Sequence, residues 1–260
     1  MPIESRSRDI VCFANRRLGA RVAYDLNSLE GVDLALVVID SPSRADIDLS
    51  SLSNGVPIVS WEDFLRKVPK IDRTYAAGVS VLFGRLIPDS VVALFEDGIV
   101  NLHPSYLPHG RGKYPATWAI WEQSPYGASA HLVTSEFDAG PLLDQVRIPI
   151  RDDDTSESLY ARGTEALWDL YLNSVRSWVG GRPVSFQEQA SGGTSHTKAD
   201  LEELQEVANA SVLPIRDHVR LLRALSMGPG SGLVLRQGVD QVLVRVTLEQ
   251  HVEQREELGQ

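Results

Sequence analysis

Short apolar runs alternate with amphipathic stretches along the first part of the chain. Residues 10–14 (IVCFA) and 34–39 (LALVVI) are continuously apolar, which is typical of strands in a parallel sheet that is covered on both faces. Between them, Leu18, Val22 and Leu26 recur at helical spacing, and this spacing predicts an amphipathic helix. A strand, a helix and a strand in that order predict a right-handed βαβ unit.

The same alternation continues as far as a pair of glycines at 180–181. Asp154 and Glu157 have the spacing of a capping box and predict the start of a long helix that runs towards Trp178. We expect an α/β fold over residues 1–189, with a Rossmann-like, mostly parallel sheet flanked by helices. Further strands are predicted at 56–59, 75–82, 99–102, 128–133 and 142–148, and further helices at 61–65, 88–94 and 117–122.

The end of the chain has a different pattern. Residues 190–194 (ASGGT) are typical of a linker. We therefore expect residues 190–260 to form a small α+β appendage. It is predicted to contain helices at 198–208 and 215–225 and a hairpin of strands 233–235 and 242–246 that turns near Gly238. Its apolar positions either pack on the core or seal a homodimer, and both interpretations stay open: Leu221, Leu222, Leu225, Val242 and Val244.

Charge and composition narrow the possible partners. The 260 residues carry a net charge of −10, with 25 Lys and Arg against 35 Asp and Glu. An acidic surface repels nucleic acids and anionic membranes, so we expect neither as a partner. The apolar runs are far shorter than the roughly 18 residues of a membrane span, and the N-terminus lacks a signal-peptide pattern. We expect a cytoplasmic protein.

Neither a disulfide nor a metal is expected. Cys12 is the single cysteine, which excludes an intramolecular disulfide, and its apolar neighbours predict a small core residue. The acidic run 152–154 is better explained as the cap of a helix than as a metal site.

Candidate chemistry gathers where one predicted strand ends. Asn101 and His103 are two residues apart, so their side chains share one face of the strand, and Pro104 ends it. Ligands of open α/β sheets bind at this carboxyl edge. Asp138, just before Gly140, follows another predicted strand in a position that can return to the same edge.

An amide, an imidazole and a carboxylate brought together suit acyl-group chemistry. The imidazole of His103 can accept or deliver a proton near neutral pH. The carboxylate of Asp138 can orient that imidazole and stabilise its charged form. The amide of Asn101 can donate to an oxygen that becomes negative in a tetrahedral intermediate. No serine or cysteine nucleophile is needed if the attacking group is the substrate's own amine.

The ordered motifs of this segment closely resemble the folate-dependent formyltransferases. These motifs are 101–108 (NLHPSYLP), 111–112 (RG), 118–120 (WAI) and 138–140 (DAG). The resemblance covers residues 70 to 180 well. It implies N10-formyltetrahydrofolate as formyl donor and Asn101, His103 and Asp138 as the catalytic trio. It also implies two folate-binding segments, Phe83, Gly84, Arg85, Leu86 and Ile87 on one side and Thr134, Ser135, Glu136 and Phe137 on the other.

Within this family, the later segments resemble the nucleotide-sugar N-formyltransferases. The similar pieces are 110–120, 196–204 and 219–235. The resemblance implies that the acceptor amine belongs to a nucleotide-linked amino sugar, with basic side chains near its diphosphate. The implied substrate-binding residues are Arg16, Arg17, Ser105, His109, Arg111, Gly112, Lys113 and Tyr114.

Other acceptors and other classes stay open. Methionyl-tRNA is disfavoured because residues 190–260 hold 7 Lys and Arg against 10 Asp and Glu, a poor composition for binding a phosphate backbone. Another small amine, such as a siderophore or amino-acid precursor, is a further alternative. A hydrolase that releases formate and a non-catalytic folate or nucleotide binder are the alternatives of another class. His131, on a predicted strand, is expected to be a packed or surface histidine.

Overall fold

A seven-stranded mixed sheet forms the body of the molecule. The computed structural model describes residues 7–40, 48–50, 52, 55–210, 213–237 and 240–248. The strand order is β3-β2-β1-β4-β5-β7-β8, with parallel pairing from β3 to β5 and antiparallel pairing of β5 with β7 and of β7 with β8. The strands are β1 (Arg8–Ala14), β2 (Val32–Ile39), β3 (Ile58–Ser60), β4 (Ala77–Val81), β5 (Ile99–His103), β7 (Tyr126–Leu132) and β8 (Leu142–Ile148). The predicted mostly parallel α/β fold is confirmed.

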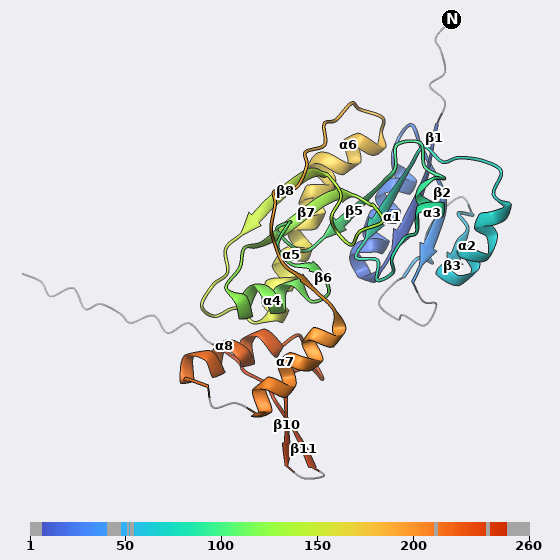
Figure 1. Ribbon diagram of the computed structural model, residues 1–260. Helices are drawn as coiled ribbons and strands as arrows, with labels where there is room; N and C mark the ends of the chain where they lie inside the picture. The colour runs from blue at the N-terminus through green and yellow to red at the C-terminus, as the bar shows by residue number, and fades with distance from the viewer. Residues whose placement is uncertain are drawn as a thin grey trace, which may run out of the picture.

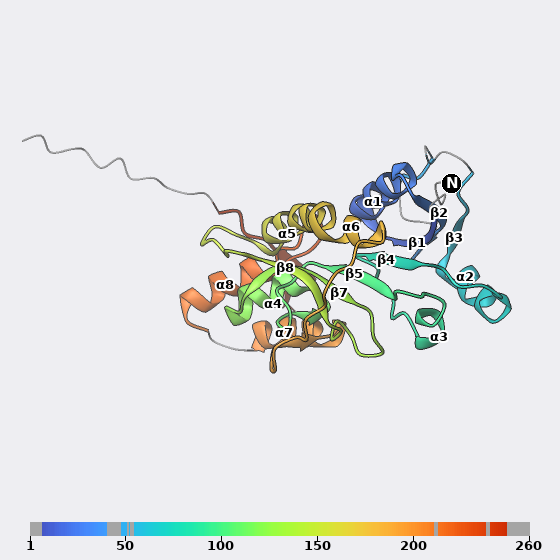
Figure 2. The same cartoon turned by 90° about the horizontal axis from the view of Figure 1, so that it is seen from above.

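Helices cover both faces of this sheet (Figures 1 and 2). Figure 2 shows α1 and α5 on one face and α2 and α3 on the other. The residues of β1 are fully buried from Ile10 to Ala14, because such a central strand contacts helices on both sides. These helices are α1 (Arg16–Ser28), α2 (Trp61–Lys67) with the 3-10 turn η1 (Val68–Lys70), α3 (Asp89–Val92), α4 (Pro115–Glu122) and α5 (Ser156–Leu170).

The start of α5 corrects one prediction from the sequence. Thr155, not Asp154, is the N-cap, and its side chain accepts from the backbone N–H of Ser158 while the Ser158 hydroxyl receives the N–H of Thr155. Asp154 is buried and instead accepts from the backbone N–H of Arg151 and from Arg162. The carboxylate is therefore used to hold the preceding turn, and the capping box lies one residue later than predicted.

The predicted helix towards Trp178 is present, but it is not uniform. After α5, the π-helical turn η2 (Tyr171–Val175) leads into α6 (Arg176–Val179). Gly181, in the left-handed region with φ 82°, ends the helix as expected. Cys12 is a core residue as predicted, and burial raises the pKa of its thiol to about 12.

The last part of the chain gathers at one end of the molecule, beside α4 (Figure 1). It comprises β9 (Ser195–His196), which pairs with β6 (Arg111–Gly112), then α7 (Lys198–Ala210), α8 (Ile215–Leu225) and the hairpin of β10 (Leu233–Gln237) and β11 (Asp240–Val244). The turn predicted near Gly238 lies outside the described residues. Leu221 and Leu225 are buried in a cluster with Trp118 of α4. These two leucines therefore pack within the protein, whereas Val242 is 50% exposed, and the homodimer stays a prediction.

None of the helices in the described part of the chain is long and apolar enough to cross a membrane.

Candidate active site

A cavity of about 720 Å³ opens at the carboxyl ends of the parallel strands. Its lining comes from the segments that follow β1, β4 and β5, from the segment 133–138 after β7, and from residues 195–198 of the last part of the chain. Parallel strands end at the same edge of a sheet, so loops far apart in the sequence meet there. The edge predicted from the sequence is therefore where the structure has its cavity.

Strand β5 places Asn101 and His103 on one face. Leu102 between them is fully buried on the other face, as the two-residue period of a strand requires. His103 is 7% exposed, and its Nε2 lies 2.9 Å from the carbonyl oxygen of Gly110. A carbonyl oxygen only accepts, so Nε2 carries the hydrogen and donates to Gly110. This bond fixes the orientation of the imidazole ring.

Asp138 reaches the same place from the segment after β7. Its Oδ2 lies 3.6 Å from Nε2 of His103 and accepts from the backbone N–H of Gly112 at 2.8 Å. Its Oδ1 accepts from Nδ2 of Asn101 at 3.4 Å. The amide, the imidazole and the carboxylate that the sequence singled out thus meet around one carboxylate group.

The surroundings of Asp138 favour its charged form. Burial would by itself raise the pKa of this carboxyl group. The positive charges of His103 and His131, a hydrogen bond from His131 and the N–H of Gly112 together hold the pKa of Asp138 well below its ordinary value. The group is therefore a carboxylate at neutral pH, with a ring nitrogen of His103 at 3.6 Å and one of His131 at 3.4 Å.

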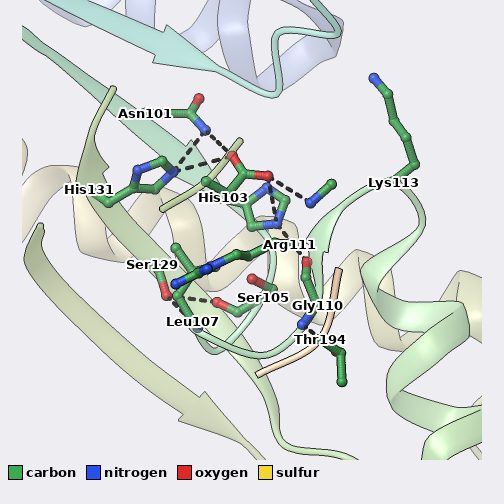
Figure 3. Close-up of polar contacts among 12 residues, drawn as sticks. Asn101, His103, Ser105, Leu107, Gly110, Arg111, Lys113, Ser129, His131 and Thr194 are labelled. Carbon is green, nitrogen blue, oxygen red and sulfur yellow. Dashed lines mark hydrogen bonds and ion pairs between the residues drawn. The ribbon is translucent and has the colours of Figure 1, made fainter. Parts of the chain in front are cut away.

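His131 is a polar residue next to the trio that the sequence analysis did not place in the site. It is packed, at 2% exposure, but its Nε2 lies 3.2 Å from Nδ2 of Asn101 and 3.4 Å from Oδ1 of Asp138. Figure 3 shows the side chains of Asn101 and His131 directed towards one another. The register of β5 on β7 pairs these two residues directly. In the sequence, Ser129 and His131 have the same two-residue spacing as Asn101 and His103. This spacing alone does not tell that the two pairs lie opposite each other, which follows from the register of β5 on β7.

Protonation changes what His131 does. Its Nδ1 lies 2.9 Å from the carbonyl oxygen of Leu132, so Nδ1 carries a hydrogen. When His131 is neutral, Nε2 accepts from Asn101. When His131 is protonated, Nε2 donates to Oδ1 of Asp138, and the N–H of Asn101 that faced Nε2 is released while the other N–H still donates to Asp138. The hydrogen-bonding state of Asn101 therefore depends on the proton of His131.

Two segments wall the cavity on the side of β4 and β7. Both contain large apolar side chains that stay exposed: Leu86 is 44% exposed and Phe137 is 54% exposed. Arg85 pairs with the carboxylate of Asp40 at the end of β2. Lys113 donates from Nζ to the carbonyl oxygen of Gly84 at 2.9 Å. The segment after β5 is thereby tied to the segment after β4 across the cavity.

The candidate residues divide by position. Those that line the cavity are Arg16, Phe83, Gly84, Arg85, Leu86, Ile87, Asn101, His103, Gly112, Lys113, Tyr114, Thr134, Glu136, Phe137 and Asp138. Those outside its lining are Arg17, Ser105, His109, Arg111 and Ser135. The side chain of Arg111 donates hydrogen bonds to Gln189 instead. Ser105 is buried, at 1% exposure. Ser195, Thr197 and Lys198 line the cavity without having been singled out from the sequence.

Comparison with known proteins places this fold among formyltransferases. Residues 30–175 match the family model described as formyl transferase. The mitochondrial methionyl-tRNA formyltransferase of Mus musculus is 28% identical over 203 residues, which cover 72% of this chain and 50% of the mouse protein. The chain thus spans about half the length of that curated relative.

Solved structures resemble the chain over nearly its whole length. A sugar N-formyltransferase from a Shewanella species superposes with a TM-score of 0.75 at 24% identity and covers 95% of this chain and 99% of its own. A 4-N formyltransferase from Francisella tularensis gives a TM-score of 0.83 at 18% identity, covering 95% and 100%. These structures share the fold. By the match of more than half its length to the family model, the chain belongs to the formyl transferase family.

Proposed function

We propose that this protein is an N-formyltransferase that moves a formyl group from N10-formyltetrahydrofolate to the amine of a nucleotide-linked amino sugar. The observation that carries the proposal is the meeting of Asn101, His103 and Asp138 at one cavity. These three groups suit a reaction in which the acceptor amine itself attacks the formyl carbon. Membership of the formyl transferase family supports this reaction class.

The walls of the cavity fit a flat donor that is apolar on its faces and polar at its edge. Leu86 and Phe137 are large apolar side chains that a ligand would cover. By its resemblance to the folate-binding segment of the family, the segment from Phe83 to Ile87 would hold the polar edge of the ring through its backbone groups. When bound, N10-formyltetrahydrofolate supplies the formyl group. We propose that Phe83 to Ile87 and Thr134 to Phe137 hold it.

The trio then performs three separate tasks. Nδ2 of Asn101 donates to the formyl oxygen as that oxygen gains negative charge, and a protonated His131 leaves this N–H available. The amine nitrogen forms a bond to the formyl carbon, and the bond from that carbon to the donor nitrogen breaks. The proton lost by the amine passes to the leaving nitrogen. His103, held at Nε2 by Gly110, keeps Nδ1 to carry this proton, and Asp138 stabilises the imidazolium.

The acceptor side of the cavity favours a small anionic substrate. Arg16, Lys113 and Lys198 line the cavity, although the chain as a whole carries a net charge of −10. Three cations that line one cavity suit a diphosphate. Residues 1–189 would form the catalytic domain, and the appendage 190–260 would supply the part of the acceptor wall at residues 195–198.

Two further observations support a sugar over a tRNA. Among the solved structures that cover almost the whole chain are a sugar N-formyltransferase and a 4-N formyltransferase. The appendage holds 7 basic against 10 acidic residues, whereas a surface that binds a nucleic acid needs an excess of basic side chains. Methionyl-tRNA is nevertheless the second candidate, because it is named for the mouse relative.

A single acceptor panel tests the proposal. The protein is incubated with N10-formyltetrahydrofolate and, in turn, with dTDP-, UDP- and GDP-linked amino sugars, methionyl-tRNA, amino-acid and hydroxamate-precursor amines, and no acceptor. Mass spectrometry measures the formyl group gained by each acceptor, and absorbance measures tetrahydrofolate release. A formylated nucleotide sugar is expected. Formylated tRNA or another formylated amine would replace the sugar. Formate release without an acceptor would indicate a hydrolase, and folate binding without turnover would indicate a binder.

A further inference from the structure

The side chain of Gln189 joins two parts of the candidate site that are far apart in the sequence. Its Nε2 donates to the carbonyl oxygens of Asp138 and Gly140, both at 2.8 Å. Its Oε1 accepts from Arg111, at 2.6 Å from Nη2 and 3.2 Å from Nε. The opposite amide orientation would set NH₂ against a guanidinium and an oxygen against two carbonyls. The contacts therefore fix the amide in one orientation.

The turn that Gln189 grips has an unfavourable backbone conformation. Asp138 has φ of 49°, in the left-handed region that residues other than glycine rarely adopt. Gly140 is packed so tightly that a Cβ there would lie 2.0 Å from the carbonyl oxygen of Leu132. Such a conformation persists only where surrounding contacts determine it. The two hydrogen bonds from Gln189 end on both sides of this turn and supply such contacts.

Gln189 belongs to a segment that also controls the other partner of Asp138. We call residues 187–196 the strap. At its start, Gln187 and Leu142 exchange backbone hydrogen bonds of 2.8 and 2.7 Å. At its end, Thr194 and His196 accept from the backbone N–H groups on either side of Gly112. Gly112 in turn donates to Oδ2 of Asp138 at 2.8 Å. The strap thus holds both the backbone of Asp138 and the N–H that binds its carboxylate.

We propose that Gln189, supported by Arg111, is a positioning residue that sets the carboxylate of Asp138 against His103 and Asn101. The inference rests on the proposed formyl transfer, in which Asp138 stabilises the charged imidazole. Gln189 itself lies outside the lining of the cavity, so it acts through the turn and not on the substrate. The candidate substrate residue Arg111 then has a different task from the one implied by its motif.

Kinetics of Gln189 variants provide the first test. Gln189→Met keeps the length of the side chain but removes all of its hydrogen bonds. Misplacement of a reacting group by about 1 Å costs on the order of 10²-fold in rate, so we expect kcat to fall by that factor with KM unchanged for donor and acceptor. Gln189→Glu keeps an acceptor for Arg111 but sets an oxygen against two carbonyls, so its loss should equal or exceed that of Gln189→Met.

The strap provides a matched control. Gln187→Met makes the same substitution two residues earlier, at an exposed side chain whose residue bonds to Leu142 through its backbone. It should keep the wild-type kcat. Equal losses in Gln187→Met and Gln189→Met would show a general effect on the strap and overturn the proposal. A wild-type kcat in Gln189→Met would also overturn it.

A second measurement does not depend on activity. In ¹H–¹⁵N spectra, a lengthened hydrogen bond from Gly112 to Asp138 moves the Gly112 amide proton upfield. We expect this shift in Gln189→Met and a smaller one in Arg111→Met, which leaves the donors of Gln189 in place. If Gln189→Met fails to fold, Arg111→Met and Gln189→Glu provide the same readout. An unmoved Gly112 resonance in folded variants would overturn the positioning role of Gln189, whether or not an acceptor is found. An inactive wild type whose variants still show the shift would overturn only the proposed function.

A double-mutant cycle separates positioning from a structural role. If Gln189 acts through Asp138, Gln189→Met should have no further effect on kcat in an Asp138→Asn background. Losses that multiply in the double variant would show that Gln189 acts independently of Asp138 and would overturn the proposal.

Discussion

The strand-borne and the turn-borne members of the trio are held in place by different means. Asn101 and His103 lie on β5, which is paired with β4 on one side and β7 on the other. Asp138 lies on an irregular segment, in a left-handed conformation, and its backbone is held by Gln189 from 51 positions away in the sequence. Two catalytic candidates are thus fixed by regular secondary structure and the third by side-chain contacts.

This difference separates two kinds of sensitivity. A strand in the middle of a sheet keeps its side-chain directions as long as its ladder is intact. A turn in a rarely populated conformation shifts when one of its supporting contacts is lost. The activity that depends on Asn101 and His103 should therefore fall only when one of these two residues is itself replaced. The activity that depends on Asp138 should also fall when a residue that supports the turn is replaced, even if that residue does not contact the substrate.

The largest effect is expected from His103→Ala. It removes the proposed proton carrier from the strand while the β5 ladder stays intact, so we expect kcat to fall by about 10³-fold. The melting temperature should fall as well, because Asp138 loses a neighbour that stabilises its buried charge. Steady-state formyl transfer to the acceptor identified by the panel measures the rate, and thermal unfolding measures the stability.

His218→Ala is the matched control for this variant. His218 lies on α8, outside the lining of the cavity, and its replacement should leave kcat unchanged. An active His103→Ala protein would show that the strand does not carry the proton transfer.

Much of the fold follows from local patterns. The predicted bounds 142–148 and 215–225 are those of β8 and α8, because apolar spacing and flanking turn residues suffice to define elements of this kind. The position of Asn101 and His103 at the end of a strand also follows from two-residue periodicity and Pro104. These features depend only on neighbouring residues.

The remaining features of the site depend on long-range pairing. His131 becomes a partner of Asn101 only through the register of β5 on β7, which neither strand encodes alone. Gln189 reaches Asp138 because the strap is held at residue 187 by Leu142 and at residues 194–196 by the segment 111–113. The shift of the helix cap from Asp154 to Thr155 has a local cause instead, since the N–H of Arg151 and the side chain of Arg162 bind that carboxylate.

An intermediate effect is expected from Gly140→Ala, which displaces the turn at residues 138–140 without removing a polar side chain. The added Cβ would meet the carbonyl oxygen of Leu132 at 2.0 Å, so the backbone must move. Overpacking of this kind costs about 1–3 kcal/mol of unfolding free energy, measured by urea denaturation. We also expect kcat to fall, because Asp138 moves with the turn.

Gly180→Ala tests whether this loss is specific to the turn. A Cβ at Gly180 would meet its nearest neighbours at an ordinary 3.5 Å, and φ there is −68°. It should leave both stability and kcat near wild type. If Gly140→Ala lost stability but kept its kcat, the turn would tolerate displacement, and the contrast with the strand would fail.

The smallest effect expected is a pH dependence of stability that depends on Asp138. Burial opposes its charge, but His103, His131 and the N–H of Gly112 hold the pKa of Asp138 below its ordinary value in the folded protein. The unfolded chain therefore takes up this proton first, at a pKa of about 3.9. Stabilisation by the carboxylate is complete above that pH and is lost as the pH falls through the folded pKa. The unfolding free energy of wild type minus that of Asp138→Asn should thus decrease by about 1 kcal/mol between pH 5 and pH 3. A difference that stays constant over this range would mean that the turn does not hold the carboxylate against its two histidines.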